Sequence, residues 1–339
     1  MRFFPRTLLI LADLTPPADP TNPCMNATLP KILAHGYELN ATEDSFGELR
    51  RSDDVMTDMA ALRERFAEDG YLYIPGFLDR AEVHTVRKHV AETLAQKGLL
   101  DPAYPVIEMV KKEGADMGFL ADPWHAMEYM NSIAKQNQAM QRLLYTGRII
   151  RLFEGFFEDK VRHFDFTWVR TMGRGFGTDS HCDNVYMSRG SSRLCTLWAP
   201  YGDISYEIGG LMILEGSHRQ DRMLKNYLSR DVDKYCENRP EAEKIKSGEI
   251  PWTWGGVLSN NPCTLRENLG GRWLSAEYRM GDILIFGMKT VHASLDNQTH
   301  YFRLSTDSRY QPASDPVDER WVGENPVGHG RGAKKPMIC

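Results

Sequence analysis

The stretch that decides the fold runs from residue 281 to 294 and reads Gly281-Asp282-Ile283-Leu284-Ile285-Phe286-Gly287-Met288-Lys289-Thr290-Val291-His292-Ala293-Ser294. A glycine opens a short apolar run, which is the pattern of a buried β-strand. His292 follows the run within a few residues. Because functional side chains concentrate on loops and ends held by a rigid sheet, His292 is a candidate site residue.

Other short segments, before and after this one in the sequence, also show the pattern of a strand. Phe164, Phe166 and Trp168 alternate with polar residues, which predicts a strand of period two. Further candidate strands are 193–198, 210–214 and 302–310. Short strands separated by glycine-rich turns indicate an antiparallel sandwich or barrel.

The first part of the chain is predicted to be mainly helical. A helical pattern covers 55–69, a short strand follows at 71–74, and Asp79 caps a helix that extends to about residue 96. Another helix-like segment covers about 132–157. We therefore expect helices packed outside the β-structure.

The predicted domain covers residues 51–315. Residues 1–50 are rich in proline and asparagine and show no sustained periodicity, so we expect an N-terminal arm or tail, and residues 316–339 form a C-terminal tail. Residues 219–279 are a polar, irregular insertion, too long for a simple connection.

This insertion is expected to form a lid or a substrate-facing segment. Trp252 and Trp254 lie in it and are candidate substrate contacts, with paired glycines as hinges. The alternative is that these tryptophans only anchor a long loop to the barrel, because aromatic side chains bury large areas.

Composition limits the class of partner. The 339 residues carry a net charge of −5, so no overall basic field attracts nucleic acid or an anionic membrane. Nothing approaches the ~18 consecutive apolar residues of a membrane span. The six cysteines form no C-x-x-C pair, and the N-terminal apolar run lacks a convincing cleavage site. We expect a cytoplasmic protein with a small-molecule partner, and the oligomeric state is open.

Two His-x-Asp motifs occur, His163-Phe164-Asp165 and His181-Cys182-Asp183. Chance alone predicts roughly one or two such pairs in a chain of this composition, so the motif is weak by itself. The first opens an aromatic segment, where its histidine is expected to be packed. The second follows the glycine-rich residues 173–177 and is the better metal candidate.

Two histidines and one carboxylate on one face of an octahedral ion leave three positions open, as in non-haem iron(II) oxygenases. His181, Asp183 and His292 supply this set. Arg303 follows His292 by eleven residues on the next candidate strand, and its planar fork suits a dicarboxylate co-substrate. Taken alone, Arg303 would more readily be interpreted as a surface salt bridge.

The order of the motifs is more specific than any one of them. The stretches concerned are Glu68–Leu78, His181-x-Asp183, Trp198, Asp203, Gly210–Arg219, Gly281–Phe286, His292-x-Ser294 and Arg303. From about residue 60 to 312, this order resembles the phytanoyl-CoA dioxygenase (PhyH) family of iron(II) and 2-oxoglutarate-dependent oxygenases.

The resemblance implies a mainly β fold, a double-stranded β-helix (jelly-roll or cupin-like) barrel with flanking α-helices. It also implies roles for individual residues. These are His181, Asp183 and His292 as iron ligands, Arg303 with Ser294 as the holders of the distal carboxylate of 2-oxoglutarate, and Trp198 as a lining residue of that pocket. In a strand, Trp198 is equally well interpreted as a core aromatic.

The implied cofactors are Fe(II), 2-oxoglutarate and O₂, with ascorbate in vitro. The implied activity is hydroxylation of a C–H bond of a small molecule with release of succinate and CO₂. Asp183 argues against a halogenase variant, which lacks the carboxylate ligand. The alternatives are a metal-binding cupin-like enzyme without 2-oxoglutarate, which has no use for Arg303, and a non-catalytic binding protein on the same barrel.

Overall fold

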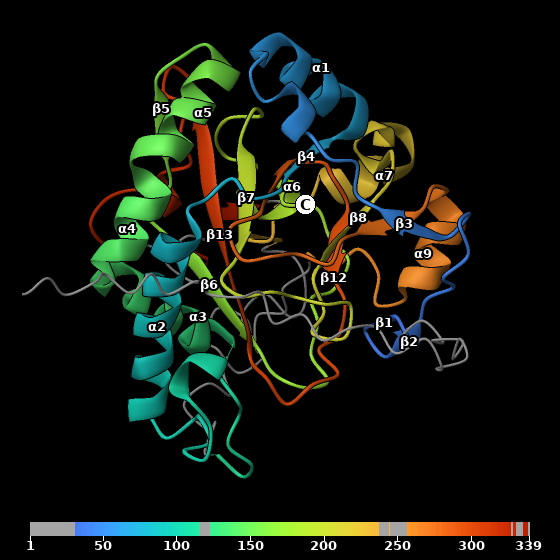
Figure 1. Ribbon diagram of the computed structural model, residues 1–339. Coiled ribbons are helices and arrows are strands. Elements are labelled where there is room, and N and C mark those ends of the chain that lie inside the picture. The colour runs from blue at the N-terminus through green and yellow to red at the C-terminus, as the bar shows by residue number, and fades with distance from the viewer. Residues whose placement is uncertain are drawn as a thin grey trace, which may run out of the picture. The chain divides into compact units, whose positions relative to one another are not determined.

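The computed structural model describes residues 31–115, 123–236 and 256–326, together with 244, 328–329 and 335–337. Two β-sheets form its centre (Figure 1). The larger has the order β4 (Tyr71–Ile74), β11 (Ile283–Gly287), β7 (Cys195–Pro200), β13 (Arg303–Pro312) and β5 (Val161–His163), with β6 (Trp168–Met172) also paired to β13. The smaller has the order β12 (His292–Ser294), β8 (Leu211–Leu214), β10 (Trp273–Ser275) and β3 (Phe46–Glu48).

The chain passes back and forth between the two sheets. It runs from β7 in the larger sheet to β8 and β10 in the smaller, then to β11, β12 and β13 in alternate sheets. Every pairing in these two sheets except that of β10 with β3 is antiparallel. Trp198 and Leu284 from the larger sheet pack against Leu211 and Ile213 from the smaller, so the sheets enclose one core. This confirms the expected double-stranded β-helix.

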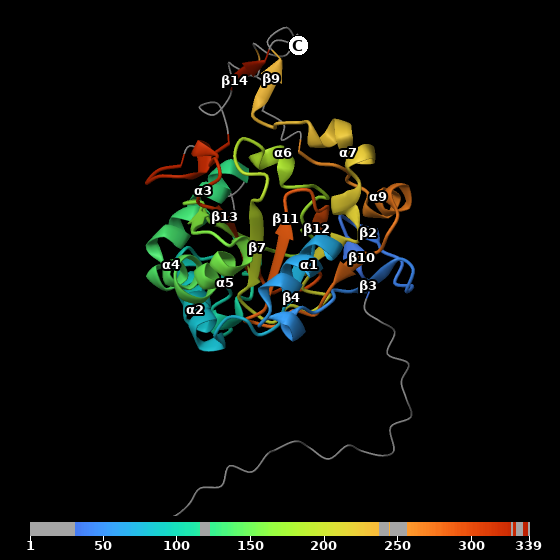
Figure 2. The ribbon, with the colours of Figure 1, turned by 90° about the horizontal axis from the view of Figure 1, so that it is seen from above.

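The helices are α1 (Met59–Asp69), α2 (Arg80–Gln96), α3 (Pro123–Gln136), α4 (Gln138–Tyr145), α5 (Gly147–Phe157), α6 (Asn184–Met187), α7 (Asp221–Leu228) and α9 (Pro262–Leu269). Single 3-10 turns cover Asp53–Val55, Val106–Glu108, Ser217–Arg219 and Glu319–Trp321. Figure 2 shows α2, α4 and α5 on one side of β7 and the strands of the smaller sheet on the other.

Helix α2 shows why the sequence folds this way. The Asp79 carboxylate accepts hydrogen bonds from the backbone N–H groups of Ala81 and Glu82, which is the predicted N-cap. Val83, Val86 and Val90 follow at helical spacing and are buried. They belong to the core cluster between the helices and the outer face of the larger sheet. The opposite face of that sheet is therefore free to carry a site.

Two predictions of secondary structure are wrong in detail. Residues 164–167 are not in a strand, because β5 ends at His163 and β6 begins at Trp168. Phe164 and Phe166 are buried around Trp321 from the C-terminal segment, so their alternation reflects an aromatic cluster. The predicted helix 132–157 is three helices, since Asn137 caps α4 and Thr146 separates α4 from α5.

Several segments outside the predicted strands form further elements of the fold. Residues 31–50, part of the expected arm, contain β1 (Leu33–Ala34), β2 (Tyr37–Glu38) and β3, which pairs with β10. The described part of the insertion 219–279 contains α7, β9 (Lys234–Cys236), α9 and β10. β14 (Lys335–Met337) pairs with β9. Within the described ranges, no helix has the length and apolar character needed to cross a bilayer.

Candidate metal centre

Backbone pairing brings the two candidate histidines together. His181 and His292 form an isolated antiparallel bridge in which each N–H donates to the other's carbonyl, both at 3.0 Å. The glycine-rich loop allows this approach: a Cβ on Gly177 would lie 2.8 Å from the Ser294 carbonyl oxygen. Segment 178–181 therefore lies directly against β12, and the two imidazole centroids are 4.2 Å apart.

Asp183 completes the cluster. Its Oδ1 lies 3.9 Å from His181 Nε2 and 3.8 Å from His292 Nε2. One potential ligand atom from each of the three residues lies within 4.8 Å of the others. Within the part of the chain that the structure describes, no other group of histidine, cysteine or acidic residues meets this spacing.

The Nδ1 atoms of both rings are occupied by the backbone. His181 Nδ1 lies 2.7 Å from the Asp179 carbonyl, and His292 Nδ1 lies 3.0 Å from the Thr290 carbonyl. A carbonyl accepts only from a protonated nitrogen, so each neutral ring keeps its lone pair on Nε2. Both lone pairs face Asp183 Oδ1, which is the arrangement that metal-binding histidines use.

The other oxygen of Asp183 is held away from this point. Asp183 Oδ2 accepts from the Thr196 hydroxyl and lies 3.1 Å from Arg309 Nη2. Arg309 itself lies over the Trp168 ring, 4.7 Å from its centroid. The carboxylate is thereby fixed with Oδ1 alone toward the histidines.

Electrostatics favour the ligand forms of all three side chains. Burial, and next the neighbouring His292, lower the pKa of His181 to about 3. Burial also lowers the pKa of His292. Burial raises the pKa of Asp183, but Arg309, the histidines and Thr196 outweigh it and hold that pKa below its usual range. The cluster therefore offers two neutral imidazoles and one carboxylate, a donor set that fits a divalent iron.

Arg303 has buried N–H groups without hydrogen-bond partners among the residues described. Its Nη1 donates to the Gly209 carbonyl, while Nε and Nη2 are buried and have no hydrogen-bond partner among the residues described. Burial, and next the charge of Arg170, lower the pKa of Arg303 to about 10. Two parallel N–H donors on one guanidinium edge fit a carboxylate.

Ser294 and Trp198 are buried in the barrel interior. Ser294 is fully buried, and its Oγ accepts from the Thr178 N–H, which leaves its own O–H free to donate. Trp198 is fully buried against Tyr278, and within the described ranges its Nε1 has no acceptor. Both interpretations of Trp198, core aromatic and pocket wall, are compatible with this position.

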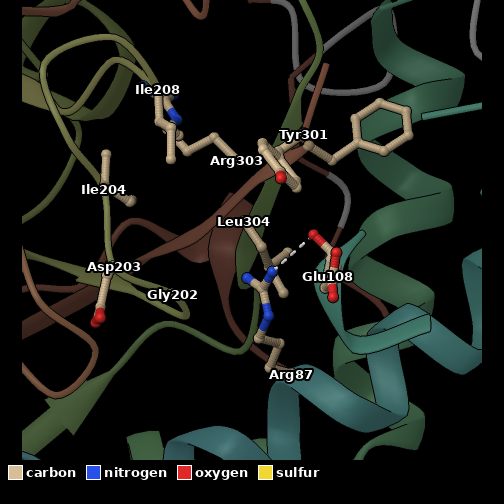
Figure 3. Close-up of a pocket in the computed structure, with 10 residues that line it drawn as sticks. Arg87, Glu108, Gly202, Asp203, Ile204, Ile208, Tyr301, Arg303 and Leu304 are labelled. Carbon is tan, nitrogen blue, oxygen red and sulfur yellow. Dashed lines mark hydrogen bonds between the residues drawn. The ribbon is translucent and has the colours of Figure 1, made fainter. Parts of the chain in front are cut away.

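A cavity of about 380 Å³ opens at the start of β13 (Figure 3). Arg303 and Tyr301 line one side of it, and Arg87 approaches from α2, where its guanidinium donates to the Glu108 carbonyl. None of the three candidate metal ligands lines this cavity. It lies at the end of the barrel where Arg303 begins β13, whereas Arg309 marks the metal end of the same strand.

The other singled-out residues lie elsewhere. His163 is packed, with its Nδ1 2.9 Å from the Phe164 carbonyl and its ring 4.2 Å from that of Tyr145. His218 packs against Gly70, where an added Cβ would meet its Nδ1 at 2.4 Å. Trp252 and Trp254 lie outside the described residues.

Sequence reasoning missed Arg309, Thr196 and Arg170. Arg309 lies on the same strand face as Arg303, six residues further along, and Thr196 is its partner across to β7. A period-two run of polar residues in the buried strand Arg303–Pro312 is the signal that indicates Arg309.

A double-stranded β-helix that places two histidines and one carboxylate around a single point defines the non-haem iron oxygenase class. The chain belongs to the phytanoyl-CoA dioxygenase (PhyH) family, whose family model matches residues 66–305. It is therefore an iron(II)- and 2-oxoglutarate-dependent oxygenase, with iron(II), 2-oxoglutarate and O₂ as cofactor and co-substrates.

Two relatives are 1-deoxypentalenic acid 11-beta-hydroxylases. The one from Streptomyces exfoliatus is 24% identical over 273 residues, covering 77% of this chain and 83% of the relative. The one from Streptomyces arenae is 23% identical over 286 residues, covering 80% and 87%. Among solved structures, EctD from S. alaskensis in its apoform matches with a TM-score of 0.51 at 16% identity, covering 91% of this chain and 98% of EctD. That likeness concerns the fold.

Proposed function

We propose that this chain hydroxylates a C–H bond of a small-molecule substrate while 2-oxoglutarate is oxidised to succinate and CO₂. One oxygen atom of O₂ enters the substrate and the other enters succinate, so the reaction balances. The observation that carries the proposal is the convergence of His181 Nε2, Asp183 Oδ1 and His292 Nε2 on one point inside the barrel.

In this proposal His181, Asp183 and His292 bind the iron. Iron(II) with 2-oxoglutarate supplies the activation of O₂ when both are bound. The chain's own contribution is to hold the ligands ready: backbone carbonyls fix both rings, and Thr196 with Arg309 fixes the carboxylate. Ligands oriented in this way need no rearrangement when the metal enters.

Arg303 binds the distal carboxylate of 2-oxoglutarate, with Ser294 and Trp198 as further donors. The support is the pair of buried, unpaired N–H groups on Arg303, because leaving such donors unpaired costs ~1–3 kcal/mol each. In a metal enzyme without 2-oxoglutarate, no ligand would pair with these buried N–H groups and offset their cost. The arrangement therefore favours a dicarboxylate co-substrate over the cupin-like alternative.

Succinate release tests the proposal. Purified protein is incubated with iron(II), ascorbate and 2-oxoglutarate, and small molecules are added one at a time, beginning with 1-deoxypentalenic acid because two relatives are named for it. The expected result is that one compound raises succinate release and gains a single oxygen by mass spectrometry. Succinate formation that does not require iron, or product without succinate, would contradict it.

A further inference from the structure

Arg170 is a charged residue of the barrel interior to which the proposed reaction assigns no role. It lies on β6 directly opposite Ser305 of β13, so both side chains point to the same face of the sheet. That face is the barrel interior, since Arg170 Nε donates at 2.5 Å to Asp307 Oδ2, and Asp307 lies two residue pairs further along the same strands.

This single bond uses one edge of the guanidinium. Nε is engaged by Asp307, a buried carboxylate, and within the part of the chain described here Arg170 makes no other hydrogen bond. The terminal Nη1 and Nη2 groups therefore present their outward-facing N–H bonds as a second fork. Asp307 holds that fork in a fixed orientation, which is what a specific ligand contact requires.

The side chains on this face differ in their exposure to solvent. The Arg170 side chain is 29% exposed, whereas Asp183 and Arg309 are each 3% exposed. Among the candidate ligands His181 is the most exposed, at 14%. Of these side chains Arg170 is the most open to solvent, whereas Arg303 is 2% exposed.

Electrostatics agree that Arg170 faces the metal centre. After burial and His292, the charge of Arg170 is among the effects that lower the pKa of His181, and it also acts on Arg303. Arg170 is therefore near enough to act electrostatically on both a candidate iron ligand and the candidate 2-oxoglutarate residue.

We propose that Arg170 binds a carboxylate of the substrate that is hydroxylated, and so makes this enzyme selective for organic acids. The inference rests on the proposed function. A planar carboxylate fits the Nη1–Nη2 fork with two parallel bonds. Asp307 already offsets part of the charge, so one anionic group of a single charge suits the site better than a phosphate dianion.

The test measures binding to the iron(II)–2-oxoglutarate protein without O₂, so that no turnover occurs. The probes are cyclic and aliphatic monocarboxylic acids, each paired with its primary amide, with cyclohexanecarboxylic acid as the first pair. The wild-type protein is expected to bind at least one acid about tenfold or more tightly than its amide, the size of a charge-assisted bond. Arg170→Gln should lose that preference, and Arg170→Lys should keep part of it.

Arg174→Gln is the matched control, because Arg174 is an exposed arginine in the adjoining loop. It should behave as wild type, and Arg170→Gln should leave the affinity for 2-oxoglutarate unchanged. A wild-type protein that binds no acid better than its amide contradicts the proposal, even if Arg170→Gln fails to fold. An Arg170→Gln variant that loses 2-oxoglutarate affinity but keeps the acid preference assigns Arg170 to the co-substrate and overturns it.

These outcomes are separable from a failure of the proposed function. If wild-type protein binds neither iron nor 2-oxoglutarate, the proposed function fails. If it binds both and shows no acid preference, only the role of Arg170 fails.

Discussion

Replacing Arg303 by methionine should separate co-substrate binding from folding. Arg303 is 2% exposed, and its Nε and Nη2 are buried without partners in the described ranges. Each unpaired donor costs ~1–3 kcal/mol, whereas the one bond to the Gly209 carbonyl is worth about as much as one of these. Methionine has a similar reach and no polar group, so it removes two unpaired donors at the loss of one bond. Without 2-oxoglutarate, the metal-loaded variant should therefore have a free energy of unfolding at least as large as that of wild type.

The affinity for 2-oxoglutarate, unlike the stability of the protein, should fall strongly. Two charge-assisted bonds contribute ~1.5–3 kcal/mol each, so Arg303→Met should weaken 2-oxoglutarate binding by at least about a hundredfold. Arg303→Lys, which keeps the charge but loses the fork, should weaken it roughly tenfold or more.

Urea unfolding with and without 2-oxoglutarate measures both effects. At a hundredfold excess over its Kd, 2-oxoglutarate should stabilise wild type by about 2.7 kcal/mol, and at the same concentration it should hardly change Arg303→Met. Arg87→Met is the control, because Arg87 lines the same cavity but donates to three backbone carbonyls. Its loss should reduce stability without changing the 2-oxoglutarate affinity. Retained stabilisation by 2-oxoglutarate in Arg303→Met would refute this account of Arg303.

Three further outcomes follow from the same geometry. Thr196→Val removes the hydroxyl that donates to Asp183, so iron affinity should fall about tenfold in a metal titration, while Thr196→Ser should retain it. Burial lowers the pKa of His181 and His292, so their contribution to stability is complete above the unfolded pKa of about 6.5 and is lost as the pH falls below it. Urea unfolding of the metal-free protein at about pH 5 should show a loss of about 2 kcal/mol from His181 and a further loss from His292, and alanine at both positions should remove this pH dependence. Gly209 has φ +84°, and its carbonyl accepts a hydrogen bond from Arg303. Gly209→Ala should therefore lower the free energy of unfolding in urea by at least about 1 kcal/mol and weaken 2-oxoglutarate binding.

The sequence predicted the parts of the fold and site that depend on local pattern. The apolar run 283–286 and the cap Asp79 are readable from a few neighbouring residues, and both appear where expected. The sequence also predicted that His181 and Asp183 lie beside His292, because the glycine-rich loop before His181 marks a close backbone approach that the segment before His163 lacks.

What the sequence could not supply is register. Thr196 contacts Asp183 only because β7 and β13 pair with Thr196 opposite Arg309, and no local pattern fixes that pairing. The aromatic alternation at Phe164 and Phe166 misled for a related reason. Their partner Trp321 lies more than 150 residues away, and a cluster around a distant side chain buries alternate residues just as a strand does.

The central claim is that His181, Asp183 and His292 form one iron site, and iron stoichiometry tests it most directly. Wild-type protein and His163→Ala should each bind one iron(II) per chain without O₂, with 2-oxoglutarate present. Asp183→Ala should lose that binding, because an open site already uses the fewest protein ligands that it can. Full iron binding by Asp183→Ala, or loss of iron by His163→Ala alone, would contradict the account.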